Sequence, residues 1–376
     1  MRALSVLAAL AFASACTSTP DPAPVAPTSP PPQASCPEVP GAAPQAAPAV
    51  DVSDPDIEAL AAAAEKCSFE SASFDWSCPA FKEWRSENDD LFEGPSGNAT
   101  ILRLLESTDI KKRALATERG FTAARTFFSE APRAKRLLAA LDKERESRLL
   151  QAYGKFAAYI DGSKMLGDEL RALAKHPASE VRRAFAEHVL PQHPTPFSLE
   201  LTKTLIEDAD GGVRRAAIRS LSANGRTRAS DGVCATLKAQ LSRTDKLIED
   251  VVDAGSTSKC PGMNALVVAE VEKRAADIGS APASGGPSYQ SALSTLCWRD
   301  STPAELKKRA FEVALKITPK LTDGWQKRWY LGLFRTCDLT RAKAALTPYL
   351  KDKDKDVAER AKEELDRVEE ELKSKP

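Results

Sequence analysis

The sequence lacks the short motifs through which common enzymes hold cofactors and nucleophiles. It contains no glycine-rich phosphate loop, no His-Glu-x-x-His pair and no Gly-x-Ser-x-Gly elbow, so nucleotide-dependent, zinc-peptidase and serine-hydrolase chemistry all lack their usual residues. Cys-x-x-Cys knuckles are also absent, which argues against a structural zinc site. We therefore expect no enzyme, no metal, no cofactor and no small-molecule substrate.

The chain as a whole has no excess of charge of either sign. Its 53 basic residues balance 53 acidic ones among 376 residues, whereas proteins that bind duplex nucleic acids carry a basic surplus. No nucleic-acid partner is predicted. Aromatic residues make up only 6% of the chain, but 42% of it is hydrophobic, which is sufficient for a large core.

Histidine is scarce, and its three copies fall close together. His176, His188 and His193 lie within 18 residues and could in principle share a metal. However, His176 precedes Pro177 in a predicted turn, and His193 lies in a proline-rich loop. We expect these imidazoles to lie near the surface rather than to bind a metal.

An acidic run near the C-terminus imitates a calcium-binding loop. Asp352, Asp354 and Asp356 alternate, and Glu363 follows at the twelfth position. The sixth position, where such loops need glycine for a sharp turn, is Val357. Acidic residues also favour the start of a helix, and this is the interpretation we prefer.

The first fifteen residues are typical of a removable export signal. Met1 and Arg2 are followed by an apolar run from Ala3 to Phe12, which is too short to span a bilayer. The small residues Ala13 to Ala15 then supply a cleavage site.

The residue that follows this segment is a cysteine. Ala13-Ser14-Ala15-Cys16 resembles the lipobox of bacterial lipoproteins, although Ala13 stands where leucine is usual. The resemblance implies that Cys16 is lipidated and becomes the mature N-terminus. Thr17 is similar to the sorting pattern for the outer membrane of Gram-negative bacteria. The same small residues also suit ordinary signal peptidase, which would leave a soluble periplasmic or secreted protein.

A proline-rich segment follows. Residues 16–50 contain eleven prolines among Ala, Ser, Thr and Gln, a composition that cannot bury a core and that favours extended conformations. We predict a disordered tether.

From Asp51 onward, the hydrophobic pattern is helical. Apolar residues recur three and four positions apart, as in Phe197, Leu201 and Leu205, without sustained alternation. Thr302 to Glu305 reads as a capping box with Pro303 at the first helical position. The predicted fold class is all-α.

One pattern returns along the chain: an apolar helix end, a polar turn, and then an aliphatic residue followed by basic residues and alanines. Successive copies lie 39, 32, 32 and 35 residues apart, which is the length of two helices. The aliphatic residues that mark these copies are Ile110, Leu149, Val181, Val213 and Ile248.

This pattern resembles the HEAT-repeat family of helical solenoids. Asp210, Val213 and Arg214 match its turn-acid and Val-Arg pair best, and Val181 with Arg182 form the second match. The resemblance implies an armadillo-like α-α superhelix of stacked hairpins. We expect the arginines to pair with turn acids of the adjacent repeat, because ligand binding by such rows is less usual.

The composition divides the chain further. We predict an acidic helical cap over 51–100, HEAT-like repeats over 101–278, a flexible loop over 279–290, and C-terminal repeats with a terminal cap over 291–376. The cap has twelve acids and three bases, whereas residues 101–230 have 24 bases and sixteen acids. These opposite charges favour packing of the cap on the first repeats.

Eight cysteines require an accounting. Cys16 and Cys36 lie in or beside the tether, and six remain in folded segments. Six cysteines allow about 15 connectivities, among which proximity favours Cys67–Cys78, Cys234–Cys260 and Cys297–Cys337. Disulfides point to an oxidising compartment.

One helical segment is unusually aromatic. Trp325, Trp329, Tyr330, Leu333 and Phe334 fall at helical spacing. Core packing accounts for such a face, and an exposed tryptophan or tyrosine in it would mark a partner site.

Together these features predict a non-catalytic, extracytoplasmic lipoprotein, held to the membrane by its lipid, that binds an unidentified protein of the cell envelope through a helical-repeat surface. The alternative is a HEAT-like enzyme or a polyanion- or nucleic-acid-binding protein that uses the basic surface of residues 101–230.

Overall fold

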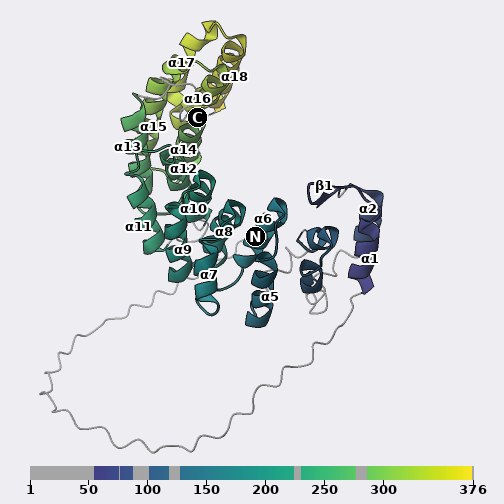
Figure 1. Cartoon of the computed structure of the whole chain (residues 1–376). Coiled ribbons are helices and arrows are strands. Elements are labelled where there is room, and N and C mark those ends of the chain that lie inside the picture. The colour runs from purple at the N-terminus through teal and green to yellow at the C-terminus, as the bar shows by residue number, and fades with distance from the viewer. Residues whose placement is uncertain are drawn as a thin grey trace, which may run out of the picture. The chain divides into compact units, whose positions relative to one another are not determined.

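A computed structural model describes residues 55–75, 77–87, 101–117, 128–223, 230–276 and 286–374, and most of these are helical (Figure 1). The all-α fold class is confirmed. The predicted export signal, Cys16, the tether and Cys36 lie outside the described residues. The unit described below extends from Asp51 to Pro376.

The N-terminal part contains the only strands among the described residues. Its elements are α1 (Pro55–Ala64), β1 (Phe69–Glu70), β2 (Ser73–Phe74), α2 (Pro79–Glu87) and helical segments at 101–105 and 110–117. The two strands pair antiparallel with Phe69 opposite Phe74. Ser71 and Ala72 make the turn with φ values of 51° and 55°, so this hairpin is a short irregular insertion between α1 and α2.

Helices follow one another through the rest of the chain. They are α5 (Ala131–Leu141), α6 (Ser147–Ala157), α7 (Gly167–Leu173), α8 (Ser179–Gln192), α9 (Pro196–Ile206), α10 (Gly211–Ala223), α11 (Asp231–Gln240), α12 (Ile248–Thr257), α13 (Met263–Arg274), α14 (Gly286–Trp298), α15 (Ala304–Ile317), α16 (Gly324–Cys337), α17 (Leu339–Leu346) and α18 (Lys355–Ser374), with 3-10 turns η2 (Thr318–Lys320) and η3 (Thr347–Lys351).

The helices pack in two rows. From α6 to α18, each even-numbered helix contacts the next even-numbered one, while α9 contacts α11 and α13 contacts α15 in the second row. Helices adjacent in sequence, such as α8 and α9 or α14 and α15, join the rows. A continuous core of buried apolar side chains runs between them, because each hairpin exposes an apolar face that only its neighbours can cover.

The hydrophobic periodicity matches this burial. Leu201 and Leu205 of α9 are buried, and Phe197, one turn earlier, is half-buried. The helix starts at Pro196 after Thr195, whose side-chain oxygen accepts a hydrogen bond from the Ser198 N–H at 3.2 Å. A proline at the first helical position loses no hydrogen bond.

The approach of α6 to α8 depends on a glycine. A Cβ at Gly154 would lie 2.6 Å from the backbone oxygen of Val181, too close for any side chain. Val181 itself is fully buried. One of the aliphatic residues that marks the sequence repeat therefore also lies where two helices approach closely.

Three arginines share one arrangement. Nη1 of Arg182 donates to the carbonyl oxygens of residues 176 and 177 at 2.5 and 3.1 Å. Nη1 of Arg214 donates to those of residues 208 and 209 at 2.7 and 2.8 Å. Arg113 does the same with residues 107 and 108, at 3.0 Å each. Each arginine thus caps the carbonyl ends of the turn before its own helix.

Two of these arginines also bridge to the next hairpin. Arg182 donates from Nε and Nη2 to the Asp208 carboxylate at 2.7 and 2.9 Å, and Arg113 reaches Glu144 at 2.8 and 3.3 Å. Arg214 has no such partner, since Asp245 is held by Arg243 at 3.0 Å, and the buried Arg214 Nε makes no hydrogen bond within the described residues.

These bridges shift the titration of the two acids. Burial by itself raises the pKa of Asp208, but the Arg182 guanidinium and the Asp210 N–H outweigh it and hold that pKa below 3.8. Burial likewise opposes, without overcoming, the effect of Arg113 and the backbone N–H groups of residues 145 and 146, which lower the pKa of Glu144 below 4.5. Both carboxylates are therefore stabilised in their charged form.

The predicted capping box at residues 302–305 is wrong. Pro303 is the N-cap of α15 rather than its first residue, and no side chain caps the helix. The Thr302 hydroxyl is instead buried without a hydrogen-bond partner. The last helix begins at Lys355, close to its expected start, and most of the expected loop at 279–290 lies outside the described residues.

Three disulfides fasten the structure. They join Cys67 to Cys78, Cys234 to Cys260 and Cys297 to Cys337, with Cα–Cα distances of 5.8, 5.4 and 4.7 Å. These are the pairs that proximity along the chain favoured. Because cytosolic thiols are kept reduced, the bonds indicate an oxidising, extracytoplasmic compartment.

Replacing Arg182 with Ala should lower the free energy of unfolding by about 3 kcal/mol, because it leaves the largely buried Asp208 unpaired. The matched control is Arg136→Ala, which removes an exposed pair with Glu106 and should cost under about 1 kcal/mol. Urea denaturation measures both. Equal losses would contradict a structural role for the Arg182 bridge.

The depressed pKa values of Glu144 and Asp208 predict loss of stability in acid. Their contribution is complete above the ordinary values of 4.5 and 3.8 and is lost as pH falls through the lower folded-state values. The melting temperature should therefore decrease once the pH is lowered past about 4.5, and this decrease should be less steep in Asp208→Asn. Scanning calorimetry against pH tests this, and identical profiles for both proteins would refute it.

Candidate functional site

The most exposed aromatic cluster among the described residues lies on α16 and α18. Trp325 and Trp329 occupy successive turns of α16, and their side chains are 50% and 51% exposed. Their ring centroids lie 5.5 Å apart with the planes inclined by 60°. Together with Arg328 and Arg360 they line a shallow hollow of about 340 Å³. We call these four residues the Trp-Arg face.

The start of α16 is fixed tightly against the segment that precedes α18. A Cβ at Gly324 would lie 1.8 Å from Oδ2 of Asp354, so a larger residue here requires the Asp354 carboxylate to move. Asp354 is in turn held by the Asp356 N–H, which donates to its Oδ1 at 3.0 Å. Lys327 adds an ion pair to Asp352 at 3.1 Å, with both side chains largely buried. These contacts orient Trp325.

The two arginines are positioned by acids of α18. Arg328 Nη1 lies 3.4 Å from Asp356. Arg360 contacts Glu363 at 3.1 Å and Glu364 at 2.7 Å. Glu364 is only 1% exposed and also accepts from Arg335 of α16 at 2.9 Å. A buried anion therefore joins the two helices and fixes the Arg360 guanidinium beside the tryptophans.

The Trp-Arg face offers hydrogen-bond donors without acceptors. An indole has one N–H and no acceptor, and a guanidinium has five N–H groups and no acceptor. Within the described residues neither the Trp325 nor the Trp329 indole makes a hydrogen bond. The half-exposed rings supply apolar area of the kind enriched at binding hot spots, where tryptophan and arginine predominate.

The predicted aromatic helix divides between core and surface. Tyr330, Leu333 and Phe334 are buried, and Phe334 packs edge-on against Phe311 with centroids 5.6 Å apart. Core packing thus accounts for one side of α16, and the two tryptophans lie on its other side. Burial raises the pKa of Tyr330 beyond its ordinary range.

The acids that imitated a calcium loop have structural roles. Asp352 pairs with Lys327, Asp354 packs against Gly324, and Asp356 pairs with Arg328. Glu363 is engaged by Arg360. No cluster of three or more His, Cys, Asp or Glu suited to a metal occurs within the described parts of the chain.

The histidines do not come together as a site. The His176 Nδ1 accepts from the Ala178 N–H at 3.1 Å, and His193 Nε2 donates to the Tyr159 carbonyl at 2.8 Å. Burial lowers the pKa of both His176 and His188. Each ring therefore has a local environment of its own.

The motif residues also act locally. Asp210 Oδ1 accepts from the Val213 N–H at 2.9 Å, Val213 and Val181 are fully buried, and Arg182 and Arg214 cap turns as described above. Asp210 thus serves as a helix-start acceptor, and Arg182, not Arg214, carries the bridge between repeats.

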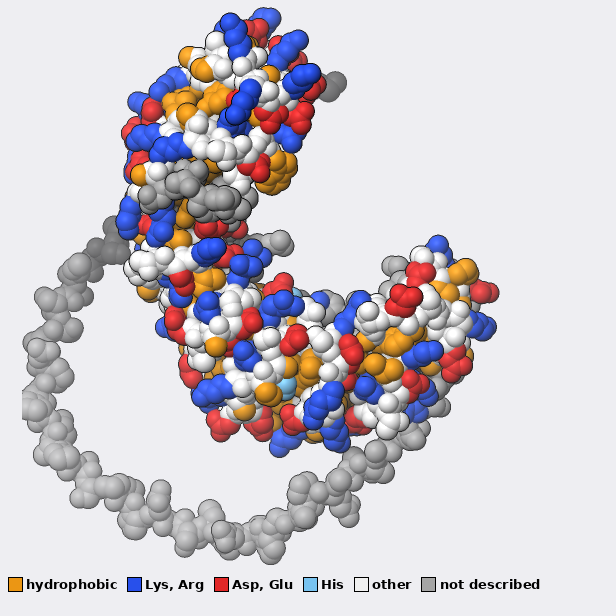
Figure 2. Space-filling view, turned by 45° about the horizontal axis from the view of Figure 1, so that its top comes forward, with side chains coloured by type: hydrophobic (Ala, Val, Ile, Leu, Met, Phe, Trp, Pro, Cys, Tyr) orange, Lys and Arg blue, Asp and Glu red, His pale blue; other side chains and the backbone are white. Residues whose placement is uncertain are grey.

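Cations of residues 101–230 are widely paired. Arg113, Arg136, Arg171 and Arg182 each contact an acid of a neighbouring helix or turn, and Arg215 and Arg219 both contact Asp250 at 3.1 Å. Figure 2 shows basic and acidic side chains interspersed over the visible face. On this face the paired cations do not gather into a separate basic patch.

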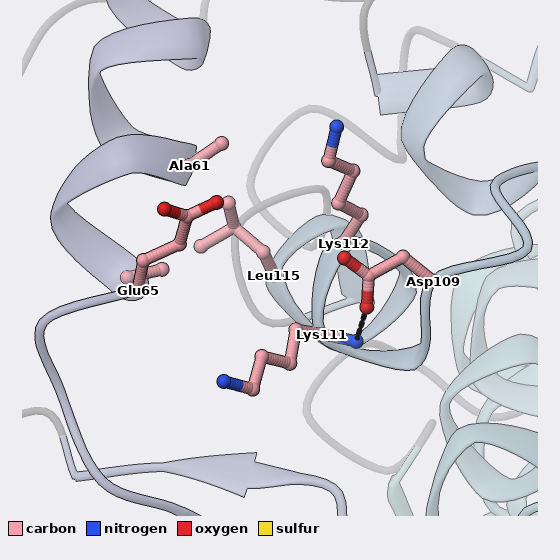
Figure 3. Close-up of a pocket in the computed structure, with 7 residues that line it drawn as sticks. Ala61, Glu65, Asp109, Lys111, Lys112 and Leu115 are labelled. Atoms are coloured by element: carbon pink, nitrogen blue, oxygen red, sulfur yellow. Dashed lines mark hydrogen bonds between the residues drawn. The ribbon is translucent and has the colours of Figure 1, made fainter.

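A second hollow lies between α1 and the helix at 110–117. It has a volume of about 430 Å³. Figure 3 shows Glu65 on one side and Lys111 on the other, with the Asp109 carboxylate accepting from the Lys111 N–H at 2.9 Å. One acid and one base thus face each other across this hollow.

Comparisons with known proteins identify no family. No family model and no curated protein match the chain. A crystal structure of an engineered protein is similar over 84% of this chain and 99% of that chain, with 14% identity and a TM-score of 0.28. A likeness at this level carries no argument. Among the described residues, no helix has the length and apolar composition needed to cross a membrane.

Sequence patterns pointed to Trp325 and Trp329 but not to their basic partners. Arg328 and Arg360 are 32 residues apart and meet only because α16 packs on α18. The one local indication in the sequence was that Arg328 lies between the two tryptophans.

Gly324→Ala should destabilise the protein by about 1 kcal/mol, because the new methyl group displaces the Asp354 carboxylate from its hydrogen bond with the Asp356 N–H. Gly332→Ala in the same helix is the control, since its Cβ meets nothing closer than Arg360 at 3.6 Å and alanine favours helix by up to about 1 kcal/mol. Thermal unfolding of the two variants measures the difference. Equal effects would contradict the tight contact between α16 and the segment before α18.

Proposed function

We propose that this protein is a non-catalytic, lipid-anchored helical-repeat module that binds another protein of the cell envelope. Cys16 carries the lipid, residues 1–15 are removed as the export signal, and residues 16–50 tether the folded unit to the outer membrane of a Gram-negative bacterium. The observation that carries the proposal is the Trp-Arg face, a preorganised, donor-rich aromatic surface.

The HEAT-like solenoid belongs to this proposal. Support comes from the two rows of helices and from the arginine arrangement shared by Arg113, Arg182 and Arg214. The spacing of 32 residues between the last two equals the sequence repeat. Stacked hairpins present extended surfaces that suit protein ligands.

The disulfides support the compartment. Disulfide-bonded chains persist outside the cytoplasm, where a lipoprotein would be found. Fractionation of cells that express the wild type and Cys16→Ser tests the anchor: the wild type should sediment with membranes, and the variant should be soluble. A soluble wild type would refute anchoring and leave protein binding to be tested separately.

Photo-crosslinking in intact envelopes tests protein binding. A photoreactive amino acid at position 328 should give a discrete protein adduct, and Trp325→Ala should reduce its yield at least fivefold because the anchoring ring is lost. The same photoreactive residue at position 298, where Trp298 is 65% exposed on α14, is the control. Equal adducts from both positions, or none from position 328, would overturn the proposal.

A further inference from the structure

The geometry points to a proline-rich, extended protein segment as the ligand of the Trp-Arg face. This inference deepens the proposed function, on which it rests, by naming the chemistry of the partner. It follows from the shape of the tryptophan pair, from the donors around it and from the charges beside it.

The tryptophan rings form a notch rather than a platform. Their planes are inclined by 60° with the centroids 5.5 Å apart, which is direct contact between the two rings. A compact ring therefore cannot enter between them, but it can rest in the angle between their exposed faces. Pyrrolidine rings project from a polyproline helix at regular intervals and dock in aromatic-lined grooves of this kind. A flat sugar ring stacks best on a single plane and gains less from an inclined pair.

The hydrogen-bonding groups are complementary to such a segment. The lining residues Trp325, Arg328, Trp329 and Arg360 carry N–H donors and no acceptors. A proline has a carbonyl acceptor and no N–H, and polyproline backbones form no internal hydrogen bonds. A proline-rich segment therefore satisfies the face without leaving donors of its own unpaired, whereas sugar hydroxyls and ordinary peptide N–H groups would meet no acceptor among these four residues.

The side chains that line the hollow do not favour a cationic ligand. Two inclined indoles alone could bind a quaternary ammonium group by cation–π attraction. Here Arg328 and Arg360 flank the rings, and each is kept in place by α18 acids at 2.7 to 3.4 Å. The hollow is lined by these guanidinium groups and by no carboxylate, so a further cation finds no counter-charge in its wall.

The face is also held ready before binding. Three contacts fix α16 on α18 and on the segment before it: Gly324 against Asp354, Lys327 with Asp352, and Arg335 with the buried Glu364. A preorganised site avoids the entropy of ordering its own side chains. A polyproline ligand is likewise pre-ordered, so both partners lose little freedom on association.

Titration of fluorescein-labelled decaproline with the purified full chain tests the inference by fluorescence anisotropy. The wild type should bind saturably. Trp325→Ala and Trp329→Ala should each weaken binding at least tenfold, because a proline ring packs against both indoles. Trp329→Phe, which keeps a ring and loses the N–H, should give a smaller loss. Trp298→Ala should bind as the wild type does.

Unchanged circular dichroism and melting of each variant establish that the fold is intact. A labelled Gly-Ser decapeptide should not bind. A linear glucan oligosaccharide and vesicles containing anionic phospholipid complete the series. The inference would be overturned if the glucan or the vesicles bind through Trp325 and decaproline does not. It would also be overturned if Trp325→Ala leaves decaproline binding unchanged.

The decaproline titration and the crosslinking experiment can fail independently of each other. A discrete envelope-protein adduct at position 328 together with no decaproline binding would overturn the proline-rich ligand and leave the protein-binding function standing. Absence of both would overturn the two together.

Discussion

The structure depends on one constraint: a single helical hairpin cannot bury its own apolar face. Burial therefore requires neighbours, and the succession of contacts from α6 to α18 supplies them. Val181 and Val213 lie at equivalent points of this succession and are fully buried. Gly154 lets α6 approach the backbone at Val181. Everything on the surface is positioned by helices whose spacing this stacking sets.

Charges add register to a core that is otherwise uniform in chemistry. Faces of leucine, valine and alanine can pack against a neighbouring helix in many registers. A guanidinium that must meet two turn carbonyls and one carboxylate allows only one register. Arg182 meets these conditions by capping residues 176 and 177 and bridging to Asp208. The buried Glu364 serves α16 and α18 in the same way through Arg335 and Arg360. There, the register-setting contact also fixes the Trp-Arg face.

The sequence predicted what depends on local periodicity and less of what depends on helix packing. The all-α class and the burial of Val213 follow from spacing alone. The row of arginines was expected to bridge adjacent repeats, and Arg182 does so. Arg214 does not, because Asp245 is taken by Arg243, a competition that no spacing shows. Thr302 similarly looked like a cap, yet its helix begins at Ala304 with Pro303 as the N-cap.

The site illustrates the same division. Helical spacing placed Trp325, Trp329 and Tyr330 on one segment, but only the packed structure separates the exposed tryptophans from the buried tyrosine. The acids at 352, 354 and 356 looked alike in sequence, and each has a different partner on α16. These pairings arise from how α18 lies on α16, which is a property of the tertiary structure.

Oxidised cysteines connect the fold with the compartment, and their mapping tests both most directly. Non-reducing peptide mass mapping of the protein isolated from its own cells should find Cys67 linked to Cys78, Cys234 to Cys260 and Cys297 to Cys337. That result requires α14 and α16 to lie side by side in an oxidising environment. Free thiols at these six positions, or links that join other pairs, would contradict the account.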